Sequence, residues 1–353
     1  MVLVISKNKE GNSMLEIVGY DLLGRDKVEG LRYTWKGSQY KKYIESAAFI
    51  NKSKGKDENI CGYTTSVSAG CVLKAQNIPC SFCRTGNLLP FSGFLTYKEI
   101  AKQNVFMVLT DMYCDEHPEL AKRKREFAYM GQGEPGFSYS QVRMAIELTN
   151  KIMHELDQQV YRHIFATCGV PESIYSYKYD LKNFFTERVT LHLSLHATDS
   201  RELLMPIDKV YSYRELINAI EDIVEISREK PCIGIMLFNQ FSPKGKGFTY
   251  TNSVENVMKI IDMLDPHKCR LSFCEYNASE ELGCAEAYPE DMLNYLLREI
   301  QTKGFEVKFF SSFGQEKKAA CGMLGGKEPE YIASEKWNEL SDLADKLILK
   351  YTD

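Results

Sequence analysis

The most constraining feature of this sequence is a set of three cysteines, Cys71, Cys80 and Cys83, spaced C-x8-C-x2-C. Thiolates are good ligands for soft metals and iron–sulfur clusters, and the close pair at 80 and 83 can hold two positions of one centre. A [4Fe–4S] cluster held by three cysteines keeps one iron open to a small-molecule ligand. The spacing therefore indicates an iron–sulfur centre with one open position.

Two other interpretations of these cysteines stay open. A closed zinc site requires a fourth protein ligand, which Cys61 can supply, and the chain would then be a zinc-stabilised binding module. The cysteines can also be small core residues, although Ser81 and Arg84 are placed beside the pair where apolar neighbours would be expected.

Composition limits the class of protein. The 353 residues are 44% hydrophobic, enough for a sizeable core, and the formal net charge is −4. No overall positive charge marks the chain as a nucleic-acid binder, although basic runs such as 122–125 permit an RNA partner. Eleven cysteines, an odd number, predict free thiols in a reducing compartment. With no signal-peptide pattern and no membrane-length apolar run, we expect a cytoplasmic protein with no membrane contact.

The pattern of elements predicts an α/β fold. Short β segments fill the region up to residue 50, and from about residue 96 helices and strands alternate, which implies a parallel sheet with helices outside. We expect a partial (β/α)6 barrel in residues 61–326, a small β-rich extension in 1–60, and a C-terminal helical extension in 327–353. The six expected barrel strands are 127–130, 163–167, 189–195, 232–238, 269–274 and 306–310.

Polar stretches follow the expected strands. In barrels of this kind the active site lies at the carboxyl ends of the strands, so these stretches and the cysteine loop should converge on one mouth. The stretches are Gly131-Gln-Gly-Glu-Pro135, Cys168-Gly169, Ser194-Leu195-His196, Asn239 and Asn277.

An ordered set of motifs resembles the RlmN/Cfr family of radical S-adenosylmethionine (SAM) methyltransferases. The resemblance runs from about residue 43 to 325. Its segments are Glu45–Ile50, Cys80–Gly86, Met130–Pro135, Thr167–Pro171, Leu193–Ala197, Leu204–Ile207, Tyr276-Asn277 and Ala319–Leu324. Two departures accompany it: the family's cluster loop is C-x3-C-x2-C, and its members that act on ribosomal RNA carry a helical N-terminal RNA-binding domain that is not evident here.

The resemblance implies a [4Fe–4S] cluster on Cys71, Cys80 and Cys83, with SAM bound to the open iron. It implies that Glu134 accepts a hydrogen bond from the SAM ammonium and that Gly131 and Gly133 let the backbone approach the ligand. The other SAM-binding residues it implies are Ser194, Leu195, His196 and Asn277, with Phe82 packed by the adenine. On their own, His196 can be a satisfied core histidine and Asn277 a turn former.

The resemblance also implies the reaction, methylation of an sp2 carbon. Cys321 would carry the methyl group, Glu45 would accept the ring proton, and Cys61 would resolve the covalent adduct, leaving a disulfide with Cys321. The substrate would be adenine in RNA or a smaller purine-like molecule, and the electron donor a flavodoxin- or ferredoxin-like protein. The alternative within the same superfamily is hydrogen abstraction from a small molecule without methyl-cysteine chemistry.

Overall fold

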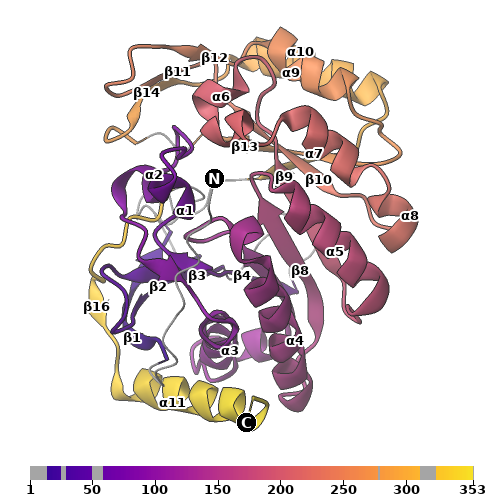
Figure 1. Ribbon diagram of the computed structural model, residues 1–353. Coiled ribbons are helices and arrows are strands. Elements are labelled where there is room, and N and C mark those ends of the chain that lie inside the picture. Colours follow the sequence, from indigo (N-terminus) through magenta and orange to yellow (C-terminus); the bar gives the residue numbers. More distant parts are fainter. Residues whose placement is uncertain (1–13, 25–28, 50–58, 277–278, 311–322, 353) are drawn as a thin grey trace.

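The fold is built on one 11-stranded sheet, seen in a computed structural model that describes residues 14–24, 29–49, 59–276, 279–310 and 323–352. The strand order is β15-β13-β10-β9-β8-β7-β4-β3-β2-β1-β16 (Figure 1). The first seven strands in this order are parallel, and their bounds are Val307–Phe310, Arg270–Glu275, Cys232–Leu237, Val189–Ser194, Val160–Thr167, Lys124–Tyr129 and Ile60–Thr64.

The expectation of a parallel barrel-like sheet is confirmed, with one strand more than expected. The six predicted strands are β7, β8, β9, β10, β13 and β15, and β4 precedes them as a seventh parallel strand. Helices outside the sheet follow the strands, as Figure 1 shows for α4, α5 and α7. Their bounds are α4 (Tyr139–Glu155), α5 (Pro171–Asn183), α7 (Tyr213–Ile220), α8 (Ile223–Ser227), α9 (Val254–Asp262) and α10 (Glu290–Thr302).

The β-rich extension continues the same sheet. Strands β1 (Glu16–Leu23), β2 (Gly30–Lys36) and β3 (Ile44–Phe49) are antiparallel neighbours, and β3 pairs with β4. The strand β16 (Tyr331–Ile332) joins on the far side of β1. Residues on both sides of the expected boundaries at 60 and 327 therefore share one sheet.

Two helices cover this antiparallel part. Thr96-Tyr-Lys-Glu99 has the spacing of a capping box, and the structure contains it: Thr96 Oγ1 accepts from Glu99 N and the Glu99 carboxylate accepts from Thr96 N at the start of α3 (Tyr97–Met112). Helix α11 (Glu335–Lys350), shown in yellow along the bottom of Figure 1, packs on α3 and β1. The segment 213–227 forms two helices, α7 and α8, and Arg228 ends α8 with φ at +57°.

A second buried cluster lies apart from the main core, among loops that follow the strands. It contains Cys71 and Cys80 together with Cys168, Leu204 and Phe238. The small sheet of β11 (Gln240–Pro243), β12 (Tyr250–Thr251) and β14 (Gly283–Glu286) lies beside it, since Phe241 and Tyr250 belong to the same cluster. The sequence pattern did not predict these three strands.

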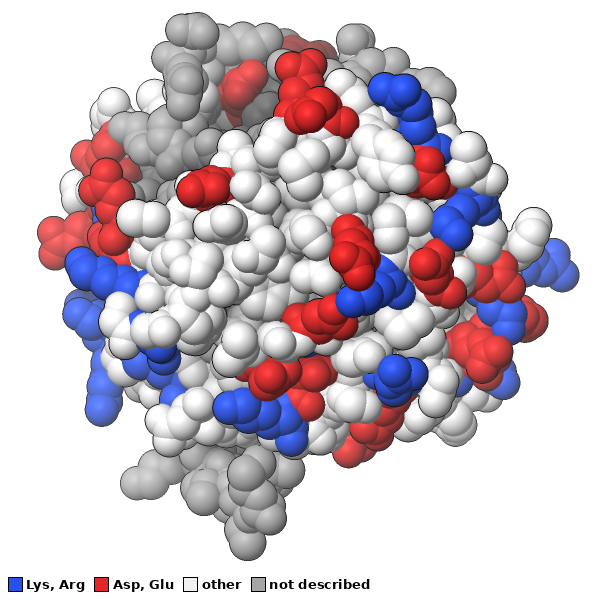
Figure 2. Space-filling model, turned by 90° about the horizontal axis from the view of Figure 1, so that it is seen from above, with Lys and Arg blue, Asp and Glu red and all other residues white. Residues whose placement is uncertain are grey.

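Two surface properties bear on partners. Among the described residues, no helix has the length and apolar character needed to cross a membrane. Figure 2 looks down on the molecule from the top of Figure 1, and acidic and basic side chains are interspersed on that face. This mixture agrees with the absence of a basic field in the composition.

Candidate active site

The cysteine loop folds around two short helices. Cys71 precedes α1 (Val72–Ala75), and Cys83 precedes α2 (Arg84–Leu88) and accepts a hydrogen bond from Gly86 N. The helical turn of α1 and a left-handed residue, Asn77, take up the long gap between Cys71 and Cys80. The C-x8-C spacing is thus accommodated by compact structure. Asn87 closes the loop by donating from Nδ2 to the carbonyls of Cys80 and Cys83, each at 2.8 Å.

The three thiols face one another across this loop. Burial raises the pKa of Cys71 well above its usual value, and negative charge on Cys83 and Cys80 raises it further. Within the described part of the chain, no three Cys, His, Asp or Glu side chains are close enough to ligate a single metal ion. A cubane cluster binds each cysteine to a different iron, so its ligands stand further apart. Three thiols carried on one loop are the donor set that a [4Fe–4S] cluster with one open iron takes.

The Gly-Gln-Gly-Glu-Pro stretch packs against the loop that follows β4. A Cβ at Gly131 would lie 2.6 Å from Ser66 Oγ, and one at Gly133, whose φ is +105°, would collide with Ser68. These glycines therefore permit contact between two protein loops, which the expectation of ligand approach did not include. Gln132 donates through Nε2 to Glu45 at 3.2 Å and so connects this stretch to β3.

Glu134 is a buried carboxylate with several donors. Its Oε1 accepts from Gly136 N at 2.8 Å and Thr167 Oγ1 at 2.5 Å, and its Oε2 accepts from Cys168 N at 2.8 Å. Burial raises the pKa of Glu134, and the hydrogen bonds from Cys168, Thr167 and Gly136 work in the opposite direction. The carboxylate thus ties the end of β7 to the end of β8.

The stretch after β9 meets the cysteine loop. The His196 ring packs edge-on against Phe82 with ring centroids 5.3 Å apart, and its backbone has φ at +59°. Burial, with help from Arg201, lowers the pKa of His196 to about 3, so its ring is neutral. Leu195 is buried, Ser194 is half-buried, and the Ser194 carbonyl accepts from Arg201 Nη2 at 3.2 Å. Asn277 lies outside the described residues.

Glu45 lies on β3 with no exposed surface. Its Oε2 accepts from Gly326 N at 2.7 Å, and its Oε1 is 3.1 Å from Nη1 of Arg32. Cys321 lies outside the described residues, but the residues shortly after it are held by α2. Arg84 donates from Nη1 to the Met323 carbonyl at 2.7 Å, and Thr85 donates to the Leu324 carbonyl at 2.8 Å.

Cys61 lies on the opposite face of the sheet from Glu45. Ala48 and Tyr63 are paired across β3 and β4, and Cys61 shares their face, whereas Glu45 shares the face of Ala47. Burial and Asp111 raise the pKa of the Cys61 thiol to about 12. The sheet therefore separates the Cys61 and Glu45 side chains, and the role of Cys61 in resolving the adduct on Cys321 stays a prediction.

Sequence reasoning missed the polar residues that support the predicted site. Gln132 lies inside a motif already singled out, and Arg84 directly follows Cys83, so both were in view. Thr167 begins another of the motif segments. Arg32 gave no signal, since a lone arginine in a strand is usually at the surface.

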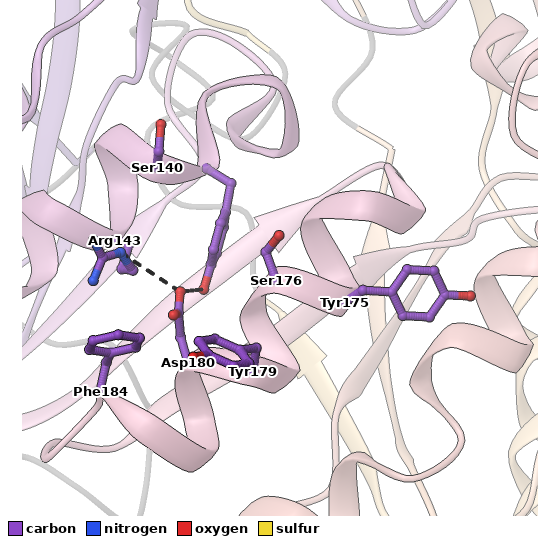
Figure 3. Close-up of a pocket in the computed structure, with 8 residues that line it drawn as sticks. Ser140, Arg143, Tyr175, Ser176, Tyr179, Asp180 and Phe184 are labelled. Atoms are coloured by element: carbon purple, nitrogen blue, oxygen red, sulfur yellow. Dashed lines mark hydrogen bonds and ion pairs between the residues drawn. The ribbon is translucent and has the colours of Figure 1, made fainter.

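One surface groove lies apart from the predicted site. A surface groove of about 550 Å³ runs between α4 and α5, where Asp180 accepts from Tyr139 and pairs with Arg143 at 3.9 Å (Figure 3). None of the predicted site residues lines it. The lining residues are Tyr139, Ser140, Arg143, Tyr175, Ser176, Tyr179, Asp180 and Phe184.

Comparison with known proteins gives a consistent family. No family model matches the chain. It is 27% identical over 271 residues to a probable dual-specificity RNA methyltransferase RlmN of Pseudothermotoga lettingae, covering 74% of this chain and 69% of the relative. It is 28% identical over 280 residues to the protein of the same name in Fervidobacterium nodosum, with 77% and 70% covered. Over about three quarters of its length, the chain is thus similar to proteins named RlmN.

Coverage and structure add detail to this assignment. The match to the RlmN-named protein of Thermoanaerobacter sp. (strain X514) is 28% identical over 200 residues and spans 56% of this chain and 54% of the relative. The fold is similar to a radical SAM methyltransferase from Sphaerobacter thermophilus, with a TM-score of 0.69, 20% identity, and 88% and 82% of the two chains covered. The similarity to these methyltransferases supports a [4Fe–4S] cluster and SAM as cofactors. The cysteine thiolates of residues 71–83 are ligands of the kind that such a cluster takes.

Proposed function

We propose that this protein methylates an sp2 carbon, with Cys321 carrying the methyl group and Glu45 accepting the ring proton. The observation that supports this most is the anchoring of the segment just after Cys321. Its residues 323 and 324 are bonded to α2, directly after Cys83, and Gly326 is bonded to Glu45. One short segment thus contacts both the cluster loop and the proposed base.

Different residues of the chain would hold the cluster, bind SAM and accept the proton. Cys71, Cys80 and Cys83 would hold the cluster, which together with SAM supplies a radical able to remove a hydrogen atom. Glu134 and the stretch Ser194–His196 would hold SAM, and the neutral His196 ring with Phe82 would form an apolar wall beside it. Glu45 would take the proton that the substrate ring loses. Asn277 is retained as a SAM-binding residue on the resemblance alone.

The substrate we propose is adenine in RNA, with a smaller purine-like molecule as the second candidate. The matched relatives are named RNA methyltransferases, which favours RNA. The described residues before Glu45 form the strands β1 and β2, so the helical RNA-binding domain of the family is not found among them. A flavodoxin- or ferredoxin-like protein would supply the electron.

Mass spectrometry of the anaerobically purified, cluster-loaded protein tests the carrier. After incubation with methyl-labelled SAM, the peptide containing Cys321 should be one methyl group heavier, and the label should move to RNA once a reductant is added. Cys321→Ala should lose both signals. Cys284→Ala, which removes an exposed cysteine on β14, is the matched control and should keep them.

The same mass-spectrometry experiment, with metal analysis, also distinguishes the proposed methyltransferase from the two alternative functions. A protein that cleaves SAM but never carries a methyl group on Cys321 would be a hydrogen-abstracting enzyme. A protein that binds zinc and no iron would be a metal-stabilised module. Methyl transfer by Cys321→Ala would contradict the proposal.

A further inference from the structure

Three charged side chains are buried in a row across the first three strands. Asp21 on β1, Arg32 on β2 and Glu45 on β3 are 1%, 3% and 0% exposed. Asp21 and Arg32 are directly paired across β1 and β2, and Glu45 lies diagonally from Arg32, since Arg32 pairs with Ala47. All three side chains therefore meet on one face of the sheet.

The arginine bridges the two carboxylates. Asp21 Oδ2 accepts from Arg32 Nε at 3.0 Å and Nη2 at 2.8 Å, and Nη1 of the same side chain is 3.1 Å from Glu45 Oε1. An unpaired charge buried this deeply would be costly, so each carboxylate depends on the shared guanidinium.

The two oxygens of Glu45 differ. Oε2 accepts two hydrogen bonds, from Gln132 Nε2 and from Gly326 N, which fix the carboxylate in the plane of these donors. Oε1 is buried and, among the described residues, accepts no hydrogen bond, although it lies in ion-pair range of Arg32. Oε1 is thus the oxygen with lone pairs available for a proton.

Charge balance explains why Asp21 is present. An arginine alone would stabilise the Glu45 anion and make it a poor base, because an adjacent opposite charge favours the ionised form. Asp21 formally neutralises Arg32, so the three groups together carry one negative charge. Within the described part of the chain, the other groups that contact the Glu45 carboxylate are the neutral Gln132 and Gly326 N. Arg84, beside Gly325, is paired with Glu281 at 2.5 Å.

We propose that Arg32 and Asp21 are positioning residues that tune Glu45 as a base, and that Glu45 Oε1 is the atom that receives the substrate proton. This inference rests on the proposed function for the identity of the base. In this arrangement Arg32 keeps the Glu45 carboxylate ionised and oriented. Asp21 offsets the charge of Arg32, so that Glu45 keeps its affinity for a proton.

Infrared spectroscopy of the full chain, purified anaerobically with its cluster, tests this without SAM or substrate. The carbonyl band of protonated Glu45 is isolated by subtracting the spectrum of Glu45→Gln, because other carboxyls such as Glu134 are also buried. Arg32→Met should move the pH midpoint of this band upward by about 1–3 pH units, and Asp21→Asn should move it downward by a similar amount. Arg32→Lys, which keeps the charge, should remain nearer to wild type.

Opposite shifts in the two variants are the decisive result, because a purely structural role would not change sign. Arg162→Met removes another buried arginine, paired with Glu126 at 2.6 Å, and is the control that should leave the Glu45 band unmoved. If Arg32→Met does not fold, the downward shift of the pH midpoint in Asp21→Asn still tests the proposal. Equal midpoints in wild type and Asp21→Asn, or shifts of one sign, would overturn the assignment. The titration needs no turnover, so its failure is distinct from failure of methyl transfer.

Discussion

Replacing Glu134 by glutamine separates two roles that the structure gives to one carboxylate. The substitution keeps the shape of the side chain and removes its charge. Because one oxygen faces two donors and the other faces Cys168 N, the amide nitrogen must oppose at least one N–H group. The less costly orientation keeps Gly136 N and Thr167 Oγ1 bonded and leaves Cys168 N without an acceptor.

The expected loss of stability follows from the number of donors left without an acceptor. One buried donor left unsatisfied costs about 1–3 kcal/mol, so the free energy of unfolding should fall by this amount. Loss of the charge that faces the SAM ammonium should weaken SAM binding by about 1.5–3 kcal/mol, or roughly 10- to 150-fold. Thr167→Val is the matched control, since it removes a neutral donor and keeps the carboxylate. It should change SAM binding little.

The pH dependence carries a definite sign. Burial raises the pKa of Glu134, so the folded protein holds a proton there to higher pH than the unfolded chain does. The contribution of this group to stability is therefore complete below the unfolded pKa and is lost as pH rises through the folded pKa. The stability deficit of Glu134→Gln should shrink over the same range, because glutamine does not titrate. SAM affinity of the wild type should rise there, because deprotonation frees the carboxylate for the ammonium.

Anaerobic calorimetry with SAM and urea unfolding measure the two effects separately. If Glu134→Gln binds SAM as tightly as the wild type while losing stability, the carboxylate only joins the ends of β7 and β8. The SAM affinity of the wild type should change with pH and that of Glu134→Gln should not. The reverse result would refute the assignment of the raised pKa to a carboxylate that binds SAM.

Two further predictions concern the cysteines. Cys71→Ala, Cys80→Ala and Cys83→Ala should each abolish iron binding and SAM cleavage, measured by iron content and 5′-deoxyadenosine release, whereas Cys168→Ala should retain iron; a full cluster in Cys71→Ala would show that the third ligand is another residue. Cys61 should resist alkylation in the folded protein at pH 8, because burial raises the pKa of its thiol to about 12, and exposed Cys284 should react under the same conditions; rapid labelling of Cys61, read by peptide mass, would contradict this prediction.

Local signals in the sequence predicted much of this fold. The capping box at Thr96 and Glu99 is complete within four residues, so it fixed the start of α3 without knowledge of the rest of the chain. Repeated strand–helix units predicted the parallel sheet for the same reason. Strand β4 was missed because its five residues carry little pattern, and its place depends on β3 and β7, which pair with it from distant parts of the sequence.

The placement of the site residues likewise depends on contacts between distant parts of the sequence. Alternation within 60–64 shows that Cys61 and Tyr63 share a face, but only the register with β3 shows that this face is not that of Glu45. Arg32 in a strand is expected at the surface, and its burial depends on carboxylates 11 residues before and 13 residues after it, joined by turns whose geometry the sequence does not specify. The cysteine ligands and Glu134 needed no such long-range information to be named.

The bond between Gly326 and Glu45 joins residues that are 281 positions apart. During synthesis the N-terminal strands leave the ribosome first, but Gly326 and the β16 strand that pairs with β1 emerge only after the whole parallel sheet has been made. Until then the Glu45 carboxylate on β3, inside the nascent sheet, lacks one of its donors. Completion of the proposed base is therefore a late event in folding, and a ribosome stalled before residue 326 would hold a nearly finished sheet with an unfinished site.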